Sequence, residues 1–238
     1  SNQVGDLIQI DLMLAERGRA AQWYGRAERF MRGGILPAQV LETDSFLKDH
    51  PNPENDSWRN MSARAIGGFG FPTPTTRFEP GKGGVNTIDI TQGAAQAICA
   101  FREKIVTRDT MGVHLNLLFS AETPYASVTS QLPVKGYLEI TLKETGALWV
   151  RIPQNIADGS FAIQCDGKDV PFIVCNGYAV TSVQKAGTVL AVSFQPAIKV
   201  EQEYIHHVPY EVHWYGEQVT DVLPHKGVAP LFPYFPAP

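Results

Sequence analysis

Acidic side chains in the N-terminal part of the chain offer the most direct route to chemistry. Two carboxyl groups on either side of a scissile bond can act as a paired general acid and general base. Asp6 is the most informative, because it lies in an otherwise apolar segment where burial of an unpaired carboxylate would be costly. Alternatively, Asp6 bonds to neighbouring backbone or to an arginine and is structural. The acidic residues of this region are Asp6, Asp11, Glu16, Glu28 and Asp89.

Aromatic residues form a second group with a possible binding role. Residues 65–72 read Ala-Ile-Gly-Gly-Phe-Gly-Phe-Pro, a loop whose glycines allow its backbone to come close to a ligand. Its alternative role is to seal the helical layer with the rings of Phe69 and Phe71. It is not a phosphate loop, since it lacks the Gly-Lys-Ser/Thr ending. Four residues are therefore our candidate substrate-binding groups: Asp6, Phe69, Phe71 and Asp89. Three further aromatic residues could stack on sugar rings or belong to the core: Trp149, Trp214 and Tyr215.

Metal and cofactor sites are not indicated. His206 and His207 are adjacent, so on a strand they would point to opposite faces, and no carboxylate completes a ligand set with His213. The three cysteines, Cys99, Cys165 and Cys175, lack metal-ligand spacing and predict buried free thiols. Nucleophile-elbow and zinc-protease motifs are absent. We expect neither a metal nor a cofactor.

The composition limits the class of protein. The 238 residues are 44% hydrophobic and 18% charged, which is typical of a soluble globular protein. A net charge of −4 provides no basic field for nucleic acid or anionic lipid, and no apolar run reaches membrane-spanning length. We therefore expect no nucleic-acid partner and no membrane association. Ser1-Asn2 resembles the remnant of a cleaved tag, so a removed leader remains compatible with the sequence.

The elements that must position these residues change in period near residue 108. Before it, apolar residues recur at helical spacing and predict helices over residues 4–16, 20–32 and 92–106. Gly33-Gly34 interrupts the second helix, which could resume over residues 35–41. Residues 43–91 are rich in Pro, Gly, Asn and Asp and predict a long loop. The buried stripe of the third helix is predicted to contain Ala94, Ala95, Ile98, Phe101 and Ile105.

After residue 108 the pattern is β throughout. Short alternating segments separated by Gly-containing turns predict an antiparallel sandwich resembling a jelly roll. The expected fold class is α+β, with a helical segment over residues 1–108 and a β-sandwich domain over residues 109–238. The predicted strands cover residues 113–119, 136–142, 148–152, 161–165, 178–183, 189–194, 209–214 and 218–223. A proline-rich extended tail closes the chain at residues 230–238.

Several blocks, in order, resemble the C-terminal half of glycoside hydrolase family 127, the bacterial β-L-arabinofuranosidases with their DUF1680 relatives. Val-Gly-Asp-Leu-Ile at residues 4–8 and Ala-Glu-Arg-Phe-Met-Arg at residues 27–32 resemble late helices of that family. Residues 66–69 and 87–91 resemble the loop leading to its active centre. Val-His-Leu-Asn-Leu-Leu at residues 113–118 and Leu-Trp-Val-Arg-Ile-Pro at residues 148–153 resemble sandwich strands. Residues 210–216 and 224–227 resemble its closing strands.

The resemblance implies an (α/α)6 barrel followed by β-sandwich domains. It also implies a cysteine nucleophile on zinc, but the residues for that centre are missing here. Gln-Gly-Ala-Ala occupies residues 92–95, where the family has a cysteine pair, and the next cysteine is Cys99. Because glutamine and alanine cannot replace a thiolate, the zinc mechanism and its catalytic residues do not carry over.

Three readings follow from these observations. The first is the C-terminal part of a bacterial glycoside hydrolase on plant or microbial glycans, inactive alone because half a barrel cannot position both carboxylates. The second is a sugar-binding or scaffold relative, and the third is a self-contained interaction domain. The expected partners are carbohydrate and either the missing N-terminal barrel helices or a second copy of the chain. A periplasmic or secreted location would suit this role.

An exposed apolar helical face would favour the first reading, because such a patch marks a missing partner. A closed concave site with paired carboxylates would instead favour an independent enzyme.

Overall fold

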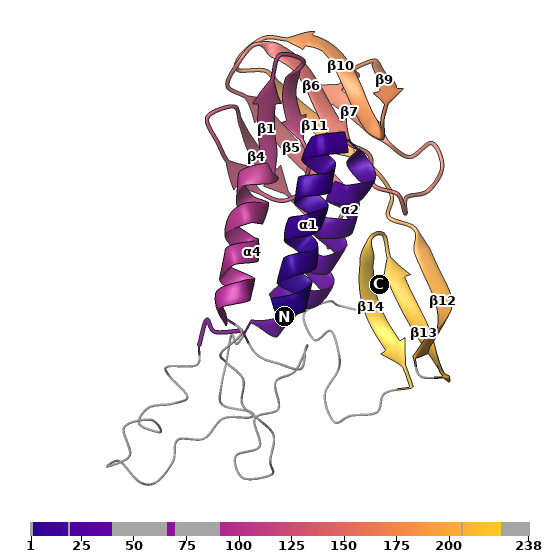
Figure 1. The fold of residues 1–238 in the computed structure, drawn as a ribbon. Coiled ribbons are helices and arrows are strands. Elements are labelled where there is room, and N and C mark those ends of the chain that lie inside the picture. The colour runs from indigo at the N-terminus through magenta and orange to yellow at the C-terminus, as the bar shows by residue number, and fades with distance from the viewer. Residues whose placement is uncertain (1, 19, 40–65, 70–90, 206, 225–238) are drawn as a thin grey trace.

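The computed structural model describes residues 2–18, 20–39, 66–69, 91–205 and 207–224. These residues form three α-helices and fourteen strands in three sheets, so the predicted α+β class is confirmed. Figure 1 shows the helices standing below a two-sheet sandwich, with the third sheet beside them. No helix among the described residues is long and apolar enough to span a membrane. The division at residue 108 stays a prediction.

The first helix lies between the other two and contacts both. It is α1 (Asn2–Gly18), and its neighbours are α2 (Ala21–Phe30) and α4 (Thr91–Lys104). The backbones of α1 and α4 approach very closely, since a Cβ added at Gly5 would lie 2.7 Å from the carbonyl oxygen of Gly93. Glycine at both positions therefore lets these helices touch without intervening side chains.

The segment after α2 continues without an interruption at its glycines. A π-helix, η1 (Met31–Ile35), follows α2 directly and contains Gly33-Gly34, and a 3-10 turn, η2 (Leu36–Ala38), follows it. Pro37 lies in this last turn, where its missing N–H leaves no helical hydrogen bond unmade. The predicted interruption is therefore wrong, because a wider helical turn accommodates the glycines.

Two sheets form the sandwich. The first has the order β1-β2-β6-β10-β9 and the second the order β3-β4-β5-β11-β7-β8. Their strands pair antiparallel except β2 and β6, which run parallel. The bounds in the first sheet are β1 (Val106–Asp109), β2 (Gly112–Leu115), β6 (Gly146–Arg151), β9 (Phe172–Cys175) and β10 (Tyr178–Gln184). Those in the second are β3 (Ala121–Glu122), β4 (Ala126–Ser130), β5 (Tyr137–Leu142), β7 (Ala162–Cys165), β8 (Lys168–Asp169) and β11 (Val189–Ser193).

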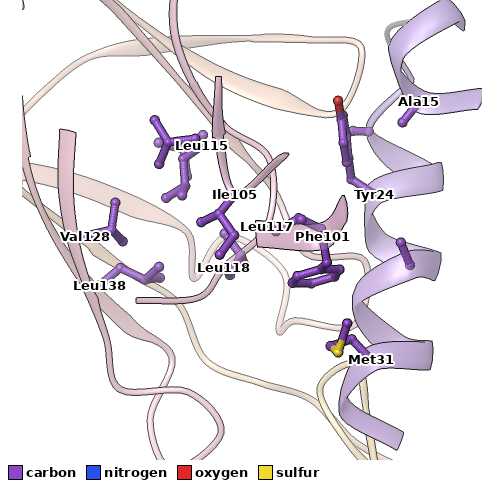
Figure 2. Packing of buried hydrophobic residues seen from close by; sticks show 14 of the residues in the cluster. Ala15, Tyr24, Met31, Phe101, Ile105, Leu115, Leu117, Leu118, Val128 and Leu138 are labelled. Carbon is purple, nitrogen blue, oxygen red and sulfur yellow. The ribbon is translucent and has the colours of Figure 1, made fainter. Parts of the chain in front are cut away.

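One continuous apolar core joins the helices to the sandwich. Strands alternate between inward apolar and outward residues, which buries Leu115, Leu148 and Val150 of the first sheet completely or nearly so. Figure 2 shows Phe101 and Ile105, from the end of α4 and the residue after it, between the helical layer and the sandwich. Burial of such side chains contributes roughly 1.5–3 kcal/mol each, so the two layers stabilise each other.

The third sheet is a three-stranded meander. It contains β12 (Ile198–Ile205), β13 (Val208–Tyr215) and β14 (Gln218–Leu223), and β14 contacts η1. The strand over residues 198–205 was not predicted, because its polar residues Glu201, Gln202 and Glu203 hide the alternation. Strands β1, β3, β4, β8 and β9 were also missed.

Three other predictions need correction. In α4, Ala95 is exposed and Ala97 is buried, because the helix presents a slightly rotated face to α1. The strand predicted over residues 113–119 ends at Leu115, since the following residues turn to bond with α2. Cys99 is exposed, and Cys165 and Cys175 are half-buried, so the cysteines are free thiols but not buried ones. The proline-rich tail lies outside the described residues.

Candidate functional site

The predicted site residues fall in different places. Asp6 is exposed on α1, so the argument for a buried carboxylate at this position fails. Phe69 is buried in the common core and forms an isolated β-bridge with Gln39, which agrees with a sealing role for its ring. Phe71 and Asp89 lie outside the described residues. The structure does not bring Asp6 and Phe69 together into a site.

Three carboxylates among the described residues are buried: Asp11, Glu28 and Glu217. Asp11 is inaccessible and accepts hydrogen bonds from the guanidinium of Arg26, including two at 2.9 and 2.8 Å from Nε. This pairing joins α1 to α2 and raises the pKa of Arg26 through the side-chain hydrogen bond. Asp11 therefore follows the structural alternative that we considered for Asp6.

Glu28 is the centre of a buried ionic network between the helices and the sandwich. Its Oε1 accepts a 2.9 Å hydrogen bond from Nε of Arg32, one helical turn further along the chain. Its Oε2 accepts bonds from the backbone N–H of Leu118 at 2.8 Å and from Nη2 of Arg151 at 2.6 Å. Arg32 also donates to the carbonyl of Leu118 and lies over the ring of Phe119. These bonds fix α2 against the end of β2.

Arg151 extends the network to the third sheet. Its Nη1 donates to Oε2 of Glu217 at 3.0 Å, and its Nε donates to the carbonyl of Asn116 at 2.7 Å. Glu217 also accepts from the backbone N–H of Gln154. A Cβ added at Gly25 would lie 3.1 Å from Nη1 of Arg151, so glycine at this position lets α2 come close. One guanidinium therefore ties together a helix, the sandwich and the third sheet.

The pKa values of Glu28 and Arg151 are shifted toward their charged forms. Burial alone would raise the pKa of Glu28, but the charges of Arg32 and Arg151 and the bond from Leu118 outweigh it and hold that pKa below its ordinary value. Burial disfavours the charged form of Arg151, yet Glu217 and Glu28 raise its pKa overall. Because these charged groups are buried and hydrogen-bonded to one another, the network fits a structural role better than a catalytic one.

An open cleft lies on the outer face of the first sheet, where the helical layer ends. A row of outward residues crosses all five strands through paired positions: Thr107, His114, Trp149, Val180 and Ile173. The adjacent part of this face, with Arg151 and Tyr178 paired on β6 and β10, is covered by the helices. The cleft begins where this cover stops.

The cleft has a volume of about 410 Å³ and a mixed aromatic and polar lining. Trp149 stacks on His114, with ring centroids 5.1 Å apart, and Tyr178 meets both rings edge-on. The indole N–H of Trp149 donates to the carbonyl of Met111, which fixes the ring. The polar lining residues are Glu16, Thr107, Asp109, Asn116 and Asn176. Such a mixture is typical of small-molecule sites.

The floor of the cleft contains two buried tyrosines. Burial, together with the nearby charge of Glu16, raises the pKa of Tyr24 to about 12, and burial raises that of Tyr178 as well. The hydroxyl of Tyr178 donates to Oδ1 of Asn116 at 2.8 Å. The Tyr24 hydroxyl, by contrast, has no hydrogen-bond partner within the part of the chain that the structure describes. Figure 2 shows Tyr24 reaching from α2 toward the sheet.

The remaining predicted groups do not form a site. Tyr215 lines a separate small cavity of about 30 Å³ near Glu28, large enough for roughly one water. The buried Nε1 of Trp214 and the amide of Gln218, which lines this cavity, have no hydrogen-bond partner among the described residues. His213 bonds to Glu211 at 2.6 Å. No group of three or more potential metal ligands occurs among the described residues.

The fold described above, a helical layer joined to a β-sandwich, is similar to a part of several solved glycoside hydrolases. A solved glycoside hydrolase superposes over 90% of the chain with a TM-score of 0.58 at 15% identity, and the match spans 36% of that protein. A family 127 β-L-arabinofuranosidase from Geobacillus stearothermophilus T6 matches with a TM-score of 0.54 at 16% identity over 90% of this chain and 34% of its own.

A second family 127 β-arabinofuranosidase gives a TM-score of 0.59 at 13% identity over 90% of this chain and 35% of its own. The chain therefore spans about a third of the length of these enzymes. No protein-family model matches it, and no curated protein is detectably similar in sequence. The resemblance expected from the sequence is confirmed for the fold.

Proposed function

We propose that the chain is the C-terminal part of a glycoside hydrolase, in which the β-sandwich supports an (α/α)6 barrel completed by preceding helices. Its substrates are plant or microbial glycans, and its catalytic groups lie in that preceding part. The fold shared with family 127 enzymes supports this proposal, and so does the short span of the match along those proteins. The chain alone lacks hydrolytic activity.

The observation that carries the proposal is the outer face of α1. Leu7, Ile10 and Leu14 recur at three- and four-residue steps and are 38–49% exposed, and Met13 beside them is 53% exposed. The opposite face of α1 already contacts α2 and α4, so these side chains form an apolar stripe without a partner among the described residues. A further layer of helices would bury it and gain the free energy of apolar transfer.

The buried ionic network of Glu28 and Arg151 is consistent with a sandwich that holds the helical layer in place. Glu28 and Arg151 fix the helical layer to the first sheet, with hydrogen bonds that span 123 residues of sequence. A layer held in this way presents α1 in a fixed orientation to any preceding helices. The buried carboxylates of the described residues, Asp11, Glu28 and Glu217, are all paired with arginine, which supports a structural rather than a catalytic part.

The stripe is tested by replacing its two most exposed members with opposite charges, Ile10→Glu with Met13→Lys, which leaves the net charge unchanged. We expect the purified chain to bind a hydrophobic dye and to self-associate, and the variant to lose most of both signals. Dye fluorescence and sedimentation velocity measure these effects. The matched control, Val134→Glu with Ile198→Lys, removes two other exposed apolar residues and should leave both signals unchanged. Equal losses in the two variants would contradict the proposal.

A second candidate function is a non-catalytic carbohydrate-binding module, which the aromatic cleft beside Trp149 favours. A binding module needs no barrel. The cleft can therefore serve the parent enzyme or an independent protein.

A further inference from the structure

We infer that the cleft on the outer face of the first sheet is a glycan-binding site. The inference deepens the second candidate function, carbohydrate binding, and does not depend on the proposed barrel, because every residue that it uses belongs to this chain. The site would take one neutral sugar unit of a glycan, packed beside Trp149 and hydrogen-bonded at the cleft floor.

The first step is the aromatic surface. The outward row includes His114 and Trp149, and it continues across the sheet through Val180 to Ile173, which is 70% exposed. The indole of Trp149 is held by its stack on His114 and by its hydrogen bond to Met111. A fixed, partly exposed indole offers an apolar surface for the C–H face of a sugar ring, and little conformational freedom is lost on binding.

The second step is the unpartnered hydroxyl at the floor. Tyr24 is 5% exposed, and its hydroxyl has no hydrogen-bond partner among the described residues. This hydroxyl is not among the inaccessible unpartnered atoms of the described residues, so it faces the cleft, where a ligand hydroxyl can bond to it in place of water. The Tyr24 phenol stays protonated at neutral pH, because its pKa is raised to about 12, so it can donate as well as accept. The amide of Asn176 at the exposed rim adds donors and an acceptor.

The third step is the charge of the cleft. The carboxylate of Glu16 pairs with Lys104, and Oδ1 of Asp109 accepts from the backbone N–H of Met111 and contacts Nε2 of His114 at 3.0 Å. These pairings reduce the negative field that would otherwise favour a cationic ligand. Apolar ring surface together with uncharged donors and acceptors matches a neutral sugar.

The test is a titration of the full chain with three neutral trisaccharides, arabinotriose, xylotriose and maltotriose, followed by NMR of the indole N–H signals. We expect at least one trisaccharide to shift the Trp149 signal saturably and to leave those of Trp23 and Trp214 in place. Trp149→Ala should weaken binding about tenfold or more, which is the loss of one good stacking contact. The matched control Tyr204→Ala removes an aromatic residue that is 71% exposed on β12 and should bind normally.

Tyr24→Phe keeps the ring and removes only the hydroxyl, so it tests the floor of the cleft without a large change in packing. We expect this variant to fold as the wild type does and to bind severalfold more weakly. The inference is overturned if no trisaccharide shifts the Trp149 signal, or if tetramethylammonium, titrated as a cationic probe, shifts it and the sugars do not. It is also overturned if Tyr204→Ala weakens binding as much as Trp149→Ala. Loss of the apolar stripe on α1 should not alter binding, so failure here and failure of the proposed function are distinguishable.

Discussion

Replacing Arg151 with methionine is expected to lower the free energy of unfolding by about 3–5 kcal/mol, because it leaves two buried carboxylates without their shared counter-ion. Glu28 would retain Arg32, and Glu217 would retain only the backbone N–H of Gln154. Three layers of the molecule meet at Arg151, so we expect the helices and the third sheet to loosen together. Urea denaturation followed by circular dichroism measures the loss.

The matched control is Arg108→Met, the same substitution at an exposed ion pair. Arg108 pairs with Glu144, and the two side chains are 44% and 40% exposed. Such surface pairs contribute about 0–1 kcal/mol, so the control should change the free energy of unfolding very little. If the two variants lose the same free energy, Arg151 does not hold the layers together. If Arg151→Met does not fold, Glu217→Gln removes one charge of the network while it keeps the shape, and should cost less.

The same network makes the free energy of unfolding fall at acidic pH. The pKa of Glu28 is lower in the folded protein than in the unfolded chain, so the unfolded state takes up a proton first as the pH falls. The stabilisation by this carboxylate is therefore complete above its ordinary unfolded pKa of about 4.3, and it is lost as the pH falls through the lower folded value. In Arg151→Met the pKa of Glu28 in the folded protein rises, so less stability should be lost over this pH range.

Replacing Gly112 with alanine is the second change for which we expect a large effect. Gly112 has a φ of +138°, and an added Cβ would lie 2.2 Å from the carbonyl oxygen of Ala147. Both the backbone strain and the clash with a paired strand must be relieved, at a combined cost of roughly 2–5 kcal/mol. The neighbouring Met111 carbonyl accepts the hydrogen bond of Trp149, so the rim of the cleft should be disturbed too.

Gly187→Ala separates the two contributions. Gly187 has a φ of +84°, but no atom lies within 4 Å of an added Cβ, so only the backbone strain remains. We expect this control to lose about 1 kcal/mol, which thermal and urea unfolding can resolve from the larger loss. An equal loss in the two variants would mean that the β2–β6 contact relaxes and that glycine is not required there.

The sequence predicted the elements with the strongest periodicity. The helix at residues 2–18 and the strands at residues 137–142 and 189–193 follow directly from apolar spacing that the core then buries. The strand at residues 198–205 escaped prediction because the polar run Glu201-Gln202-Glu203 hides its alternation. The π-helix was missed because a glycine pair usually ends a helix, and here the chain continues through a wider turn.

The site could be predicted only in part, because its residues meet through strand register. Trp149 was recognised as a residue that could stack on a sugar, yet His114 and Tyr24 come beside it only through the pairing of β2 with β6 and the placement of α2. Asp6 attracted attention because of its apolar neighbours, but the helix turns it to the outside. The buried role belongs to Glu28, whose partner Arg151 lies 123 residues away.

The most direct test of the proposed function is the intact mass of the native protein, recovered from its source cells with an antibody raised against this chain. If the chain is the C-terminal part of a glycoside hydrolase, the native mass should be more than twice 26.2 kDa, because the matching enzymes are much longer than the chain. Peptide mapping should then find amphipathic helical sequence before Val4. A native protein of about 26 kDa whose first residues coincide with those of α1 would contradict the proposal.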